Sequence, residues 1–160
     1  MAKGSLTANM VSGRVVTCYL ESCEIYQDGS WLHLQKTRSP RLCHSSAATD
    51  EAIFLIGGLF SNSTEWVPID GSPARPGPFV VRHSESHCTI QLSSDVVVVT
   101  GGKDIIHGYV TEYHLGSGRE TPLNEMRQPR YAHACGVYQD ASSRQVRRVY
   151  ISLAFIQSFW

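Results

Sequence analysis

The chain is short of the features that mark several common classes of protein. Its 160 residues hold 14 basic and 14 acidic side chains, so no net charge attracts nucleic acid or an anionic membrane. No apolar run reaches the roughly 18 residues that a membrane helix needs. No window shows a convincing helical period either. The composition predicts one folded domain without a nucleic-acid or membrane partner.

The cysteines also lack a recognisable pattern. There are five, an odd number without a CxxC pair: Cys18, Cys23, Cys43, Cys88 and Cys135. We expect buried or idle thiols rather than a disulfide framework or a zinc ribbon. The first residues contain no apolar stretch of signal-peptide type, which predicts a cytoplasmic protein. The glycosylation sequon Asn62-Ser63-Thr64 leaves an extracellular origin open.

What the sequence does contain is a repeat with a period of roughly 44 residues. Two apolar runs, "IFLI" and "VVVV", are each followed by a glycine pair, and a histidine precedes each run. A third copy opens at "RYAHACGVYQD", whereas the first unit keeps only Gly13 of its glycine pair. The repeated positions are Gly57, Gly58, Gly101, Gly102, His44, His87 and His133.

A second repeated motif follows each glycine pair. Thr64-Glu65-Trp66 matches Thr111-Glu112-Tyr113, so Glu65 and Glu112 are predicted to occupy equivalent places. Each unit then reads as about four short strands, with residues 70–79, "DGSPARPGPF", as a loop. The fold class is predicted to be all-β. Because "IFLI" and "VVVV" show no polar alternation, those strands should be covered on both faces.

These marks together resemble the kelch repeat. The likeness rests on Arg-x-x-His, a turn, four apolar residues with Gly-Gly, and glutamate beside an aromatic, and it covers about residues 10 to 138. The resemblance implies a β-propeller whose four-stranded blades present loops to a protein partner, as an adaptor or scaffold. No catalytic motif is present in the sequence, so we expect neither catalysis nor a cofactor.

Blade counting predicts an incomplete propeller of about three blades, because closed rings have four to eight. The predicted units are a partial first blade of outer strands (1–38), two blades (39–82 and 83–128) and an incomplete blade with an atypical apolar tail (129–160). The chain would then be a fragment of a longer propeller, a self-associating arc, or an arc stable alone. Uncovered blade faces would drive self-association.

The predicted contact residues lie in loops: Arg41, Arg130, Asn62, Lys103, Asp104 and His107. For Arg41 and Arg130 a structural role between blades is the competing interpretation. The histidines each lie near a cysteine, but equivalent blade positions are spread around a ring, so no shared metal site is expected. We predict a non-catalytic protein-binding module. The alternatives are a fragment without independent function and, third, a propeller-borne copper oxidase.

Overall fold

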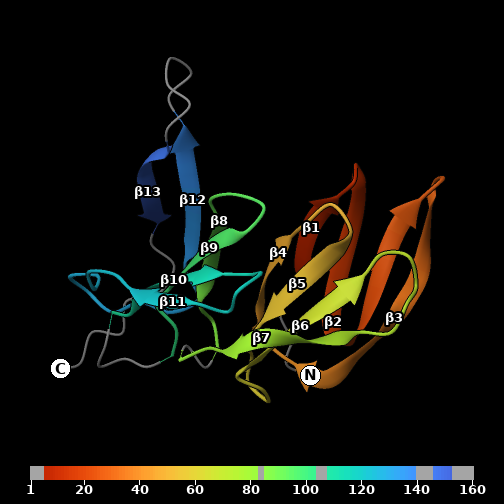
Figure 1. Cartoon of the computed structure of the whole chain (residues 1–160), viewed down its shortest axis with the longest axis horizontal. Coiled ribbons are helices and arrows are strands. Elements are labelled where there is room, and N and C mark those ends of the chain that lie inside the picture. Colours follow the sequence, from red (N-terminus) through yellow and green to blue (C-terminus); the bar gives the residue numbers. More distant parts are fainter. Residues whose placement is uncertain (1–5, 83–84, 104–107, 140–145, 153–160) are drawn as a thin grey trace.

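The computed structural model describes residues 6–82, 85–103, 108–139 and 146–152. These residues form antiparallel sheets and no helix, which confirms the all-β prediction. None of the described segments is a helix that could cross a membrane. The sheets lie one after another in chain order, as Figure 1 shows, and the described part of the chain does not close them into a ring.

The two complete repeat units form two sheets of the same design. Each sheet is a four-stranded meander in which neighbours in sequence pair with one another. The second sheet of the chain contains β4 (Ser45–Ala48), β5 (Ala52–Ile56), β6 (Ser63–Pro68) and β7 (Arg75–Val80). The third contains β8 (Cys88–Gln91), β9 (Val96–Thr100), β10 (Val110–His114) and β11 (Glu120–Pro122).

The chain ends are built on a related plan. The first sheet contains β1 (Thr7–Val11), β2 (Arg14–Gln27) and β3 (Ser30–Arg41), and the last is the hairpin of β12 (Ala134–Gln139) and β13 (Val146–Ser152). The first strands of the four sheets touch in order, with β4 against both β1 and β8, and β8 against β12. The sheets are therefore arranged around a common row of first strands.

Strand β2 folds back on itself. The Cα atoms of Cys18 and Cys23 lie 4.2 Å apart, whereas five extended residues would span about 17 Å. The side chain of Arg14 also donates a hydrogen bond to Gln27, near the other end of the strand. Leu20, with φ of 52°, lies where the direction changes. The first sheet thus has the path of a four-stranded unit, and Gly13 lies in the β1–β2 turn, not at the corner that the repeat assigned to it.

The core lies between the sheets. Ile53 and Leu55 of β5 pack toward Val16 and Ile25 of the first sheet. The alternate residues of β5 pack toward the third sheet, where Phe54 and Ile56 meet Val97, Val99 and Tyr113. All five residues of β5 are buried. The prediction that this unalternating strand is covered on both faces is therefore confirmed, and each such side chain contributes about 1.5–3 kcal/mol of burial energy.

One predicted loop is partly a strand. Residues 70–79 were assigned to a loop because of their prolines and glycines, but β7 begins at Arg75. Strand β7 is the outer edge of its sheet and pairs only with β6. Pro76 and Pro78 lack the N–H that an interior strand needs, and an edge strand tolerates that loss. The prolines therefore mark the edge, not the absence, of a strand.

Candidate interaction surface

The glycine pairs form the same backbone corner in the second and third sheets. Gly57 and Gly101 have φ of 59° and 63°, and Gly58 and Gly102 have φ of 122° and 123°. These angles are in the left-handed half of conformational space, which residues with a Cβ rarely enter. The backbone N–H of the residue after each pair donates to a carbonyl just before the first strand of the same sheet. Leu59 donates to Leu42, and Lys103 donates to Glu85.

A chain of backbone hydrogen bonds ties successive sheets together at this end of the molecule. The residue before each repeated histidine has a positive φ, in Cys43, Ser86 and Ala132. The Ser86 N–H donates to the Cys43 carbonyl at 2.8 Å, and the Ala132 N–H donates to the Ser86 carbonyl at 2.7 Å. The loops that leave this end therefore start from a fixed base.

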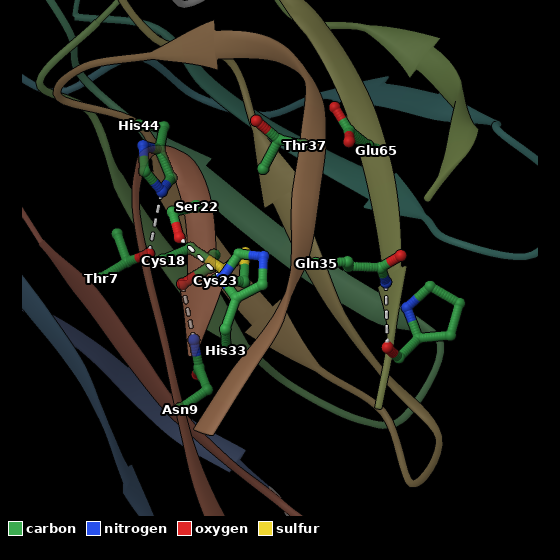
Figure 2. Close-up of a disulfide and its surroundings, with 12 residues drawn as sticks. Thr7, Asn9, Cys18, Ser22, Cys23, His33, Gln35, Thr37, His44 and Glu65 are labelled. Carbon is green, nitrogen blue, oxygen red and sulfur yellow. Dashed lines mark hydrogen bonds between the residues drawn. A yellow bond between two sulfur atoms is a disulfide. The ribbon is translucent and has the colours of Figure 1, made fainter. Parts of the chain in front are cut away.

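The three repeated histidines are buried and connect neighbouring sheets. Nε2 of His44 lies 3.0 Å from the Thr7 hydroxyl, as Figure 2 shows. His87 donates to the Ile56 carbonyl at 3.1 Å, and Nε2 of His133 lies 2.8 Å from the Thr100 hydroxyl. Burial lowers the pKa of His44 to about 4 and also lowers the pKa of His133. At neutral pH the rings of His44 and His133 therefore act as uncharged hydrogen-bonding links.

The histidines and cysteines do not gather into a metal site. Within the described ranges, no group of three or more His, Cys, Asp or Glu side chains could hold a metal ion. Each ring is engaged instead with the sheet that precedes its own. The arrangement follows from the repeat, which places one histidine in each successive sheet.

Arg41 has a structural role. Its side chain is 1% exposed and donates hydrogen bonds to the carbonyls of Gly57 and Ser63, at 2.9 and 2.6 Å. It also forms an ion pair of 3.2 Å with Glu65, which is buried to the same degree. Glu65 accepts a further hydrogen bond from the Arg38 N–H. Arg41 therefore braces the glycine corner of the second sheet and is not available to a partner, contrary to its inclusion among the contact residues.

The predicted equivalence of Glu65 and Glu112 is wrong by one residue. Leu55 lies two residues before the first glycine pair, and its cross-strand partner is Glu65. Val99 lies two residues before the second glycine pair, and its cross-strand partner is Thr111. Glu112 points to the other face and is only half-buried. Side chains alternate between faces along a strand, so a shift of one residue changes the surroundings entirely.

The third sheet has neither charge of this pair. Thr111 occupies the place of Glu65. Arg41 lies three residues before His44, and the residue three before His87 is Ser84, which is outside the described residues. A buried carboxylate without its cation would be strongly destabilising. The replacement of both charges by hydroxyl residues avoids that cost.

One exposed part of this end is the loop after the first glycine pair. Leu59 and Phe60 are 48% and 59% exposed, and Asn62 is exposed beside them. We call residues 59–62 the β5–β6 loop. The predicted contact residues include Asn62 but neither Leu59 nor Phe60. The available signal was the presence of two large apolar residues directly after a corner, where polar residues are normal.

The other predicted contact residues are placed as follows. Lys103 is exposed, but its ammonium group lies 2.6 Å from the carboxylate of the buried Glu85. The hydrogen bond to Glu85 and its charge raise the pKa of Lys103. Arg130 is half-buried, and its carbonyl accepts the Gly102 N–H at 2.9 Å. Asp104 and His107 lie outside the described residues.

The expectation of idle thiols is wrong for four of the cysteines. Cys18 is bonded to Cys23, and Cys88 to Cys135, which leaves Cys43 as the free thiol. Both pairs are brought together by the fold. The reversal in β2 juxtaposes the first pair (Figure 2), and contact between β8 and β12 juxtaposes the second, 47 residues apart in sequence. Spacing alone gave no sign of either reversal or contact.

Comparison with known proteins adds no family assignment. No family model matches the chain, and no curated protein matches it.

Proposed function

We propose that the chain is a non-catalytic protein-binding segment of a kelch-type β-propeller, and that the β5–β6 loop carries the contact. Residues 39–82 and 83–128 are its two regular blades. The kelch assignment is supported by two glycine pairs whose φ values agree within a few degrees. Each of the two sheets that contain these pairs also has a histidine that contacts the preceding sheet.

Phe60 is the observation that carries the binding proposal. Phe60 is 59% exposed and the adjacent Leu59 is 48% exposed, so both side chains would gain burial energy from a partner that covers them. Aromatic side chains of this kind are frequent anchors at protein interfaces. The base of the loop is held by the Arg41 hydrogen bonds and by the Leu59 to Leu42 backbone bond, so little order has to be gained on binding.

A second proposal is supported by a different surface. The outer face of the first sheet exposes Met10, Tyr19, Tyr26 and Trp31. Such a face is typical of a blade that lacks its neighbour, and it favours a fragment whose association is not a specific function.

Quantitative proximity labelling, followed by titration of the recovered partner with purified protein, separates the two proposals. Phe60→Ser should raise the dissociation constant at least tenfold, which is typical of the loss of an anchor residue. The matched control is Trp31→Ser, a similarly exposed aromatic on the first sheet, which should leave binding unchanged. Loss of association with Trp31→Ser and not with Phe60→Ser would contradict the loop proposal and support the fragment.

A further inference from the structure

Asn62, the first residue of the sequon, lies where an added group would not disturb the fold. Asn62 is exposed in the β5–β6 loop. Its backbone carbonyl accepts the Val81 N–H at 2.8 Å, which fixes the main chain. The side-chain amide makes no hydrogen bond to the rest of the described chain. A bulky group on Nδ2 would therefore extend into solvent without breaking a contact.

The disulfides are an independent observation that points to the same cellular environment. Disulfides persist in the secretory pathway and outside the cell, and are rare where thiol reductants are abundant. This chain joins four of its five cysteines, and the pair Cys88–Cys135 connects two separate sheets. N-glycosylation occurs on the same route. The two features are consistent with one another, and neither fits the predicted cytoplasmic location.

We propose that Asn62 is an N-glycosylation site of this protein and that the fold forms in an oxidising compartment. The sequence has one Asn-x-Ser/Thr sequon, because Asn9 and Asn124 are followed by other residues. The attached group is an oligosaccharide, and its donor is an oligosaccharide carried on a lipid pyrophosphate. This inference goes beyond the proposed binding function and concerns the same loop, where the glycan would lie two residues from Phe60.

The transfer balances without a redox step. Nδ2 of Asn62 attacks the anomeric carbon of the donor sugar, and a carbon–nitrogen bond forms. The bond from that carbon to the pyrophosphate oxygen breaks, and the lipid pyrophosphate leaves with the electron pair. One amide proton passes to a base of the transferase. The product is an uncharged N-glycoside.

The folded structure sets the order of events. The third residue of the sequon, Thr64, is only 2% exposed, and the hydroxyl of Ser63 accepts a hydrogen bond from the buried Arg41. A transferase that reads Asn62, Ser63 and Thr64 in an extended segment cannot do so once β6 has formed. The glycan must therefore be added before the second sheet folds, and the sheet must then form with the glycan in place.

The experiment is translation of the full chain, behind a cleavable secretory leader, in the presence of microsomes. We expect a discrete increase in mass that peptide-N-glycosidase reverses and that Asn62→Gln abolishes. Asn124→Gln, at an exposed asparagine without a sequon, is the matched control and should not change the shift. An unshifted chain that is protected inside the microsomes would overturn the assignment.

A second measurement tests whether the fold accepts the glycan. Peptide mass spectrometry without reduction should find the Cys88–Cys135 cross-link in the glycosylated species as often as in Asn62→Gln. If glycosylated chains lack that cross-link while the unglycosylated variant has it, the glycan is incompatible with the native sheets and the proposal fails.

Discussion

At the scale of single residues, the second sheet depends on one buried ion pair. The Arg41 guanidinium satisfies two backbone carbonyls of the glycine corner, and Glu65 neutralises it. A buried pair of this kind contributes less through its own attraction than through the damage done when one partner is removed. The hydroxyl residue Thr111 at the equivalent place in the third sheet shows that the corner can also be built without this carboxylate.

The first prediction concerns that pair. Arg41→Met should lower the free energy of unfolding by about 3–5 kcal/mol, because the Glu65 carboxylate stays buried without a cation. Arg41→Met combined with Glu65→Leu should recover part of this loss. Denaturant titration measures both. Arg82→Met, which breaks the exposed pair with Glu120, should cost at most about 1 kcal/mol. A double variant that loses the sum of the two single losses would disprove the coupling.

The second prediction concerns His44 and pH. Burial lowers its pKa from 6.5 to about 4. Between these values the unfolded chain binds a proton at this position and the folded protein does not, so stability falls as the pH drops from 6.5 toward 4. The loss approaches about 3 kcal/mol, at 1.36 kcal/mol for each unit of pKa.

Urea unfolding at pH 7 and pH 5 measures this effect. His44→Gln should reduce the difference in unfolding free energy between the two pH values, because glutamine does not titrate. His33→Gln, at an exposed histidine, should leave the difference as in the wild type. An unchanged pH dependence in His44→Gln would show that His44 is not the responsible group.

At the scale of elements, the glycine corners decide how the sheets approach one another. A Cβ placed on Gly101 would lie 2.3 Å from the Arg130 carbonyl oxygen and 2.6 Å from Cε1 of His133. Both atoms belong to the segment that enters the next sheet. The glycine pair therefore provides conformational freedom and also the space in which the following unit docks.

The third prediction separates these two roles. Gly101→Ala should lower the unfolding free energy by about 3 kcal/mol or more, since it combines a left-handed φ with a clash against backbone. Gly29→Ala is the matched control, because Gly29 also has a positive φ, in the β2–β3 turn, but an added Cβ meets no atom within 4 Å. Its cost should be about 1–2 kcal/mol. Thermal denaturation compares the two variants, and equal losses would contradict the docking role.

For the molecule as a whole, the described sheets leave the outer face of the first sheet uncovered. Tyr26 and Trp31 lie on the first sheet with their ring centroids 5.3 Å apart, and both are exposed. The second sheet has no such face, because it packs against the first sheet on one side and the third on the other. The exposed face of the first sheet can therefore pack against a sheet of a second copy of this chain or of another protein.

The fourth prediction is that the isolated chain associates with itself through this face. Sedimentation velocity should show species larger than a monomer that increase with protein concentration. Tyr26→Lys combined with Trp31→Lys should return the protein to a monomer, because charge disfavours burial of the face. Leu123→Lys, at an exposed residue after the third sheet, should have a smaller effect. A monomeric wild-type chain with a cooperative thermal transition would contradict the prediction.

Most of the strand content, the repeat period and the residues of the corner can be predicted from the sequence alone. Those features are local: an unalternating apolar run must be covered on both faces, and a Gly-Gly pair permits backbone angles that other residues avoid. The repeat also placed the histidines in equivalent positions, where the structure has them linking neighbouring sheets.

The partners of those residues depend on how distant segments pack in the folded protein. The burial of Arg41, the register that separates Glu65 from Glu112, and the pairing of four cysteines all depend on contacts between segments far apart in sequence. Sequence spacing does not encode such contacts, because a strand shifted by one residue turns every side chain to the other face. The exposure of Phe60 and Asn62 was decided in the same way, by the sheets that fold beneath their loop.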